Sequence, residues 1–134
     1  MILEDGRFRP WLEQRVGITL QQDARFIGRI VHGEVAWVVG FSHYVTHKNG
    51  ADIELTVAVE KGITRDSLKV VFGYVFDTAR CNRCTVKTSA SNTKAIELAR
   101  RLGFVHEGTL REGLGDEDTM IYGLLRNEYG KQYQ

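Results

Sequence analysis

The spacing of apolar residues along the chain predicts an alternation of helices and strands. Near the beginning, Phe8, Trp11, Leu12 and Val16 recur at three- and four-residue intervals, so that they share one face of a helix. Pro10 falls in the first turn of this helix, where its missing N–H leaves no hydrogen bond unmade. The segment Ile18–Leu20 is compatible with a short strand.

The next part of the chain is predicted to be three strands. RFIGRIVH (residues 25–32) and EVAWVVGFSHYV (residues 34–45) flank the turn His32-Gly33-Glu34 and form a hairpin. Asn49-Gly50 is a strong turn signal, and it leads into a third strand, ADIELTVAV (residues 51–59).

The periodicity then changes from strand to helix. Apolar residues spaced as on a helix predict a helix from Thr64 to Ala79, followed by a short strand, Cys84–Thr88. A second amphipathic helix follows Asn92 and stops at Gly103, a residue suited to the left-handed conformation at a helix end. Two last strands, residues 105–112 and 119–125, flank the polar loop GLGDED.

This order predicts an α/β (α+β) fold with a mixed, mostly antiparallel sheet. The strand–helix–strand crossover between residues 51–59 and 84–88 requires parallel pairing, whereas the hairpins require antiparallel pairing. With no linker or repeat in its 134 residues, we expect the chain, residues 1–134, to form one domain.

Composition and charge exclude several classes of protein. Hydrophobic residues make up 43% and charged residues 26%, as in a globular protein. Eighteen basic residues balance 17 acidic ones, so nucleic acid is not an expected partner. No apolar run approaches the roughly 18–20 residues of a membrane span, and the first residues do not resemble a signal peptide. We therefore expect a cytoplasmic protein.

The two cysteines, Cys81 and Cys84, form a single CxxC pair. A zinc site would require further ligands at suitable spacing, and a redox site would place the pair at a helix N-terminus. We interpret them as reduced structural thiols. His43 and His47 are four residues apart within or after a strand, where this spacing does not favour a metal site; they are interpreted as acceptor-site or surface residues.

The segment SNTKAIELARRLGFVHEG, followed by TLREG, resembles the last third of the GNAT acetyltransferases. These have an asparagine, an alanine, Gly-Phe and then Glu-Gly at the spacing found here from Asn92 to Glu112. The resemblance is strongest to the ribosomal-protein N-terminal acetyltransferases. It implies a GNAT fold with a central splayed pair of parallel strands, and an acyltransferase that uses acetyl-CoA as co-substrate.

The resemblance also implies a coenzyme A site. GNAT proteins bind the diphosphate in a loop at a helix start, where free N–H groups and the helix dipole favour anions. The corresponding residues here are Lys61, Gly62, Ile63, Thr64, Arg65 and Asp66, with Lys61 and Arg65 able to offset the charge of Glu60. A helix capped by Thr64 or Asp66 would explain the same residues without a ligand.

The strand before this loop carries the other candidate residues. In GNAT proteins its main chain binds the pantetheine arm, which here involves Val57 and Val59, and Asn92 would reach the same arm. A glutamate on this strand is often the general base, so Glu54 is the first candidate and Asp52 the second. Either acid could instead lie on an exposed strand face or pair with an arginine.

The chain departs from the family at the position of the general acid. Many relatives have a tyrosine in the helix after the asparagine, whereas this chain has Ala99; Tyr122 is another hydroxyl that could serve. The predicted function is acetyl transfer to a primary amine of a small molecule or protein, by a monomer or homodimer. The alternative is a non-catalytic GNAT-fold interaction module that still binds coenzyme A.

Overall fold

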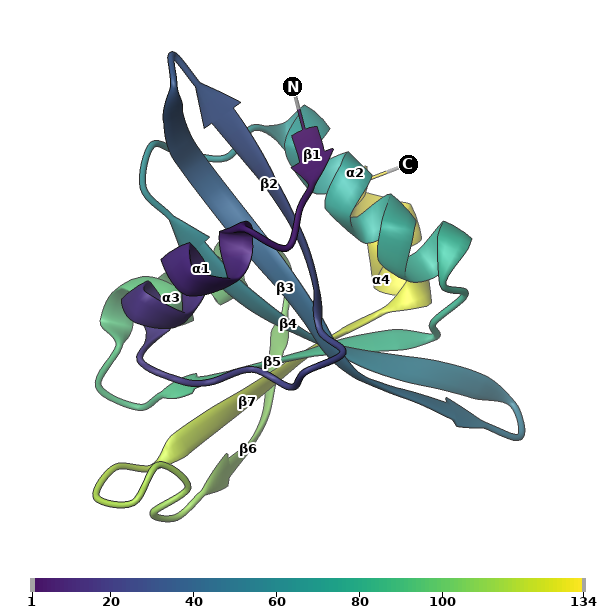
Figure 1. Ribbon diagram of the computed structural model, residues 1–134. Helices are drawn as coiled ribbons and strands as arrows, with labels where there is room; N and C mark the ends of the chain where they lie inside the picture. Colours follow the sequence, from purple (N-terminus) through teal and green to yellow (C-terminus); the bar gives the residue numbers. More distant parts are fainter. Residues whose placement is uncertain (1, 134) are drawn as a thin grey trace.

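The computed structural model describes residues 2–133, which form one seven-stranded sheet with helices on both faces (Figure 1). In chain order the elements are β1 (Ile2–Glu4), α1 (Phe8–Val16), β2 (Arg25–Val31), β3 (Glu34–His47), β4 (Gly50–Val59), α2 (Arg65–Gly73), the π-helical turn η1 (Tyr74–Thr78), β5 (Arg83–Ser89), α3 (Thr93–Arg101), β6 (Val105–Leu110), β7 (Thr119–Leu125) and α4 (Arg126–Tyr133).

The sheet has the strand order β1-β2-β3-β4-β5-β7-β6. β4 and β5 run parallel, and the other neighbouring strands run antiparallel. The helix between β4 and β5 makes this parallel pairing possible, because a crossover must carry the chain back along the sheet. The predicted mixed, mostly antiparallel sheet with one central parallel pair is therefore confirmed.

Two clusters of buried side chains hold the helices to the sheet. The larger cluster joins the inner strands to α2, α3 and α4, with Trp37, Phe72 and Phe76 at most 1% exposed. The smaller cluster includes Phe8, Leu12, Leu20 and Phe26 and holds α1 against β2 and β3. Burial of large apolar side chains of this kind contributes roughly 1.5–3 kcal/mol for each residue.

A glycine lets α1 approach the sheet closely. A Cβ atom at Gly40 would lie 3.0 Å from Cδ2 of Leu12 and 3.1 Å from Cε1 of Phe26. Because real Cβ atoms rarely have contacts this short, a larger residue on this stretch of β3 would push α1 outward and loosen the smaller cluster.

Most elements expected from the sequence are present near their predicted bounds, but the short strand at Ile18–Leu20 is not. These residues form an irregular connection after α1. The N–H of Leu20 donates to the Glu13 carboxylate at 2.7 Å, and the Leu20 side chain is buried in the smaller cluster. A side-chain partner thus takes the place of a strand partner.

Two further elements were not predicted, β1 and α4. β1 has only three residues and pairs with β2. The helix α4 has a weak sequence signal because its buried residues are the tyrosines Tyr129 and Tyr133, which pack against Phe72. α2 and α4 lie side by side (Figure 1). Among residues 2–133, no helix has the length and apolar character that a membrane crossing requires.

Candidate active site

The sheet opens between its two parallel strands. β4 and β5 are paired from Asp52 and Arg83 as far as Leu55 and Val86, and no further. Beyond this point β4 stays paired with β3 as far as Val59, while β5 stays paired with β7 as far as Ser89. Each strand follows its outer neighbour, and the twist of the sheet separates the two. The β5-facing main chain of Thr56 to Val59 therefore has no strand partner.

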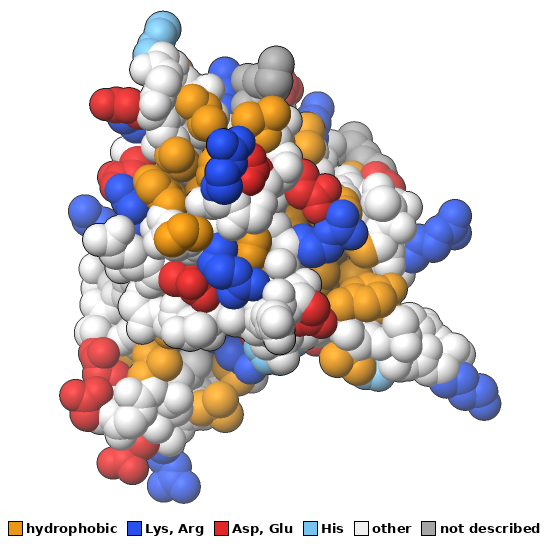
Figure 2. All heavy atoms as spheres, in the orientation of Figure 1, with side chains coloured by type: hydrophobic (Ala, Val, Ile, Leu, Met, Phe, Trp, Pro, Cys, Tyr) orange, Lys and Arg blue, Asp and Glu red, His pale blue; other side chains and the backbone are white. Residues whose placement is uncertain are grey.

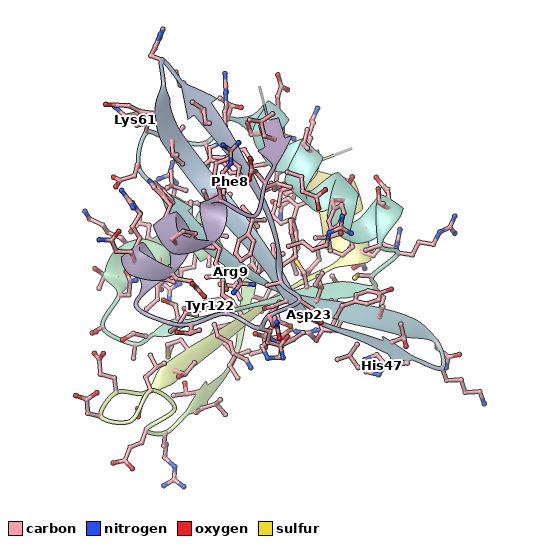
Figure 3. The ribbon with its side chains drawn as sticks, in the orientation of Figure 1. Phe8, Arg9, Asp23, His47, Lys61 and Tyr122 are labelled. Atoms are coloured by element: carbon pink, nitrogen blue, oxygen red, sulfur yellow. The ribbon has the colours of Figure 1, made fainter. Side chains whose placement is uncertain are left out.

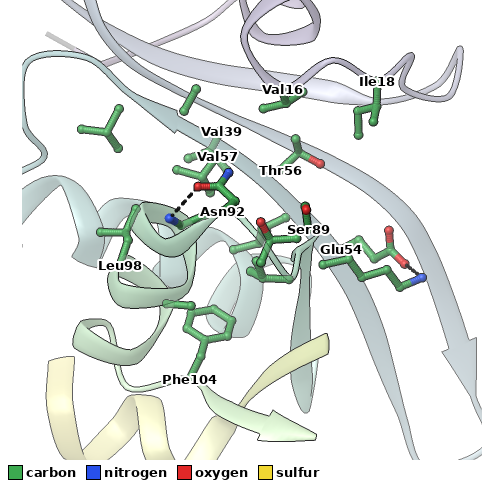
Figure 4. A pocket seen from close by; sticks show the side chains of 18 of the residues that line it. Val16, Ile18, Val39, Glu54, Thr56, Val57, Ser89, Asn92, Leu98 and Phe104 are labelled. Carbon is green, nitrogen blue, oxygen red and sulfur yellow. Dashed lines mark hydrogen bonds and ion pairs between the residues drawn. The ribbon is translucent and has the colours of Figure 1, made fainter. Parts of the chain in front are cut away.

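A cleft of about 1160 Å³ occupies this opening. The last part of β4 forms one wall, and the end of β5 with α3 forms another (Figure 4). The connection after α1 and one side of α2 complete it. Its apolar lining includes Val57, Val59, Ile63, Leu68 and Leu98, and its polar lining includes His43, Glu54, Lys87, Ser89 and Asn92.

Glu54 lies at one end of the cleft and is bound on both carboxylate oxygens. Oε1 is 2.7 Å from Nζ of Lys87 on β5, and Oε2 is 3.2 Å from Nδ1 of His43 on β3. The Glu54 side chain is 20% exposed. Three neighbouring strands thus contribute one titratable group each to a cluster that faces the cleft.

A β-bulge brings His43 into this cluster. Ser42 pairs with Glu54 and Val45 with Asp52, so that His43 and Tyr44 together stand opposite the single residue Ile53. His43 has a φ of 52°, in the left-handed region. Bulges of this kind redirect a side chain. Regular alternation would have placed His43 on the face of Phe41, away from Glu54.

The second candidate acid, Asp52, lies outside the cleft lining. It accepts a hydrogen bond from Oγ1 of Thr85 at 3.1 Å and is 3.5 Å from Nε of Arg83. Arg83 also pairs with Glu107 on β6 at 2.5 Å. Asp52 therefore belongs to a cross-strand ion-pair network, which corresponds to the arginine-paired alternative considered from the sequence.

The predicted phosphate loop forms the start of α2. Gly62 has a φ of 84°, and Thr64 caps the helix by accepting a hydrogen bond from the Ser67 N–H at 3.1 Å. The N–H groups of Arg65 and Asp66 are in the first turn, where the helix offers no acceptor. The helix start thus presents free donors, as anion binding requires.

The charged side chains of this loop have partners elsewhere in the protein. Lys61 pairs with Glu34, and this hydrogen bond lowers the pKa of Glu34 and raises that of Lys61. Arg65 donates to the main-chain oxygen of Gln132. Glu60 pairs at 2.8 Å with Arg15, a residue that lines the cleft. Arg15 therefore pairs directly with Glu60, while Lys61 is close enough to Glu60 that this carboxylate, after Glu34, also raises the pKa of Lys61.

Asn92 begins α3 at the other wall of the cleft. Its side-chain Oδ1 accepts a hydrogen bond from the Ala95 N–H at 3.1 Å, which caps the helix. Its Nδ2 is the half of the amide that has no partner among residues 2–133. Asn92 and Val57 both line the cleft, Asn92 at the start of α3 and Val57 on β4 (Figure 4).

Neither position considered for a general acid, Ala99 or Tyr122, places a proton donor in the cleft. Ala99 lines it on α3 but carries no proton donor. Tyr122 is 1% exposed, packs against His106 with ring centroids 5.3 Å apart, and does not line the cleft.

The structure thus brings some of the predicted residues together and leaves others apart. Those that line the cleft are Glu54, Val57, Val59, Ile63 and Asn92, whereas Asp52, Lys61, Gly62, Thr64, Arg65 and Asp66 lie outside its lining. The sequence did not single out Arg15 or Lys87, and it left His43 as an acceptor-site or surface residue. Lys87 could have been found from strand alternation, but the bulge at His43 leaves no clear signal in the sequence.

The charges of the face shown in Figure 2 are interspersed, with acidic and basic side chains adjoining one another.

Cys81 and Cys84 are free and buried. Within the described part of the chain, no three His, Cys, Asp or Glu side chains are grouped so that they could hold a metal ion.

No family profile matches the chain. In sequence it is similar to YdaF of Bacillus subtilis, which is named as a ribosomal N-acetyltransferase, with 26% identity over 109 residues. The match covers 76% of this chain and 60% of YdaF, so the chain spans less than two thirds of that relative's length.

Solved structures have the same fold. A mutant form of the spermidine/spermine N-acetyltransferase SpeG of Vibrio cholerae matches with a TM-score of 0.76 over 100% of both chains, at 14% identity. The ribosomal-protein-S5-alanine acetyltransferase of Vibrio fischeri matches with a TM-score of 0.64 at 19% identity, over 83% of this chain and 64% of the other.

Proposed function

Because this chain has the fold of the GNAT N-acetyltransferases and resembles them in sequence, we propose that it transfers an acetyl group from acetyl-CoA to a primary amine. The observation that carries the proposal is the opening between β4 and β5. Unpaired main-chain groups in the centre of a sheet are costly unless another molecule binds them. An extended amide-containing arm, such as pantetheine, offers both donors and acceptors to such a strand edge.

The cleft suits the rest of coenzyme A. Its apolar walls, including Val57, Val59 and Ile63, would hold the methylene groups of the arm. The free Nδ2 of Asn92 would donate to an amide oxygen of the arm from the opposite wall. Residues Gly62 to Asp66, the end of the loop and the start of α2, would bind the diphosphate through main-chain N–H groups, because Lys61 and Arg65 have other partners.

Catalysis would rest mainly on orientation. Holding the amine against the thioester carbonyl can lower the barrier by roughly 7–11 kcal/mol. An N–H on the unpaired part of β4 would stabilise the oxyanion of the tetrahedral intermediate. The cluster around Glu54, whose carboxylate lies between His43 and Lys87 in the cleft lining, would stabilise the proton that leaves the amine.

The acceptor is an amine of a small molecule or of a protein, either an N-terminus or a lysine. It would approach from the end of the cleft where Glu54, His43 and the connection after α1 meet. A panel of a peptide with a free N-terminus, a lysine-containing peptide, a polyamine and an aminoglycoside, each assayed with acetyl-CoA, would identify its class.

Coenzyme A binding is tested by two substitutions at one position. A side chain at Gly62 would meet no atom within 4 Å, and both asparagine and aspartate tolerate its positive φ. Gly62→Asn and Gly62→Asp therefore differ mainly in charge. We expect coenzyme A to raise the melting temperature of the unaltered protein and of Gly62→Asn in a concentration-dependent way, and to leave Gly62→Asp unshifted.

The thermal shift and the assay of the amine panel, taken together, also distinguish an enzyme from an interaction module. A thermal shift without acetyl transfer to any amine of the panel would favour a module that binds coenzyme A. Saturating coenzyme A with neither a thermal shift nor a heat of binding would contradict both.

A further inference from the structure

We propose that the imidazole of His43 accepts the amine proton, with Glu54 positioning the ring and stabilising its charged form. This inference rests on the proposed acetyl transfer and assigns the proton to a particular atom, Nε2 of His43. The arrangement that carries it is the bulge in β3, the contact of His43 with Glu54, and the position of both at the same end of the cleft.

Two oxygen atoms beside Nδ1 favour one tautomer of the ring. Nδ1 of His43 is 3.2 Å from Oε2 of Glu54 and 3.2 Å from Oγ of Ser42, and both oxygens can accept a hydrogen bond. With the proton on Nδ1, the lone pair of the neutral ring is on Nε2. Nε2 has no partner among residues 2–133, and the side chain is 49% exposed, so that a substrate can reach it.

Glu54 is less accessible to a substrate amine than His43 is. Lys87 contacts one of its oxygens at 2.7 Å and His43 the other at 3.2 Å, and the side chain is only 20% exposed. An amine at the mouth of the cleft would meet the imidazole first. The carboxylate would then act through the ring, as a neighbouring carboxylate does when it stabilises an imidazolium.

The structure holds His43 in the bulged conformation. The N–H of His43, which the bulge removes from the strand pairing, donates to Oε1 of Gln21 at 3.1 Å. Gln21 belongs to the connection after α1 and also lines the cleft. The charged groups around the ring are Glu54 on β4 and, through it, Lys87 on β5. Asp52 and Arg83, one strand step further along, pair with each other.

In the proposed transfer, the lone pair of the neutral amine forms the C–N bond at the thioester carbonyl carbon. The C–S bond breaks, and its electron pair leaves on the sulfur of coenzyme A. The N–H proton moves to Nε2 of His43, which becomes an imidazolium paired with Glu54 and later releases the proton to water.

His43→Asn is the most informative variant. Asparagine tolerates the positive φ of this position, as histidine does, but it cannot accept a proton near neutral pH. His47→Asn is the matched control, because His47 is at the end of β3, on the hairpin that projects from the body of the protein, and does not line the cleft (Figure 3).

With acetyl-CoA and the panel amine acetylated fastest, we expect His43→Asn to lower kcat roughly 10²–10⁴-fold and to leave the coenzyme A thermal shift unchanged. His47→Asn should keep the rate of the unaltered protein. A rate within a few-fold of normal in His43→Asn would overturn the proposal.

A second measurement tests the pair without any turnover. In the protein alone, NMR of the histidine ring nitrogens should show the neutral His43 ring protonated at Nδ1, and this preference should weaken in Glu54→Gln. The same distribution of tautomers in both proteins would overturn the His43–Glu54 pair. Absence of acetyl transfer together with a difference in tautomer between the two proteins would instead reject the proposed function, so the two failures are distinguishable.

Discussion

At the scale of single residues, two carboxylates on one strand have different surroundings. Glu54 and Asp52 are two positions apart and share a face of β4. Glu54 lies in the cleft with His43 and Lys87, whereas Asp52 accepts from Thr85 and pairs with Arg83 at the closed end of the β4–β5 pairing. Glu54 therefore faces the space that a substrate would occupy, whereas Asp52 links β4 to β5.

Glu54→Gln should therefore lower kcat roughly 10²–10⁴-fold, because the amide cannot stabilise the proton that leaves the amine. The KM for acetyl-CoA should hardly change, since in the proposed complex the main chain and the apolar walls, not Glu54, would bind this substrate. Raising the pH should recover much of the rate, because more of the amine is already neutral. Steady-state kinetics between pH 6 and 9 would measure all three effects.

Asp52→Asn is the control for this experiment. It preserves the size of the side chain and removes a partly exposed ion pair, so we expect a loss of at most ~1 kcal/mol in the free energy of unfolding and little change in kcat. Full activity in Glu54→Gln together with a large loss in Asp52→Asn would reverse the two assignments.

At the scale of elements, the cleft lies between the starts of two helices. α2 begins after Gly62 with a Thr64 cap, and α3 begins with an Asn92 cap. The two caps differ in what they leave free: the Thr64 hydroxyl also donates to Oγ of Ser67, whereas Asn92 uses its oxygen for the helix and retains its amide nitrogen for another partner. In the proposed complex with acetyl-CoA, one side chain would thus serve both as a cap and as a ligand-binding group.

Asn92→Ser separates the two roles of this residue. Serine caps a helix about as well as asparagine but has no amide nitrogen and a shorter reach. We expect a nearly unchanged melting temperature and a roughly 2- to 12-fold weaker affinity for acetyl-CoA, the loss for one hydrogen bond of about 0.5–1.5 kcal/mol. Calorimetric titration with acetyl-CoA, beside thermal melting, would test it. A lower melting temperature with unchanged affinity would mean that Asn92 serves only as a cap.

At the scale of the whole molecule, the core near the closed end of the sheet contains both cysteines. Cys81 and Cys84 are 0% exposed and lie in the larger cluster, between the end of η1 and β5. Burial raises the pKa of Cys81 from 9.0 to about 11, and burial also raises that of Cys84. These thiols are therefore neutral structural groups, unsuited to nucleophilic chemistry at neutral pH.

This burial gives the stability of the protein a dependence on alkaline pH. Above pH 9.0 the thiols of the unfolded chain lose their protons, whereas Cys81 in the folded protein keeps its proton up to about 11. The unfolded state then binds fewer protons, so stability decreases as pH rises through this window. It should decrease by at most about 1.4 kcal/mol per pH unit for each thiol.

Urea unfolding at pH 8 and pH 10 would measure this decrease. The double variant Cys81→Ala, Cys84→Ala should be less stable at both pH values because cavities are left in the core, but its loss between the two pH values should be smaller. An equal loss in both proteins would show that the thiols do not contribute to it.

The sequence by itself determined most elements, because their signals are local. The helix at Phe8–Val16 and the strands of the first hairpin follow from apolar spacing that neighbouring residues set. Gly103, with a φ of 95°, ends α3 as predicted, and Phe104 behind it is 5% exposed. Glu54 and Asn92 were singled out because their residue types at those positions match a known motif.

The tertiary structure decided which of these residues meet, since that depends on pairings between distant segments. The pairing of β4 with β5 ends at Leu55 because each strand follows its outer neighbour, β3 or β7. The residues around Leu55 give no signal of this end in the sequence. The bulge that turns His43 toward Glu54 depends on the register of two strands and on a hydrogen bond from the connection after α1. A local pattern fixes how each segment folds, but which face a side chain finally presents depends on the partner strand.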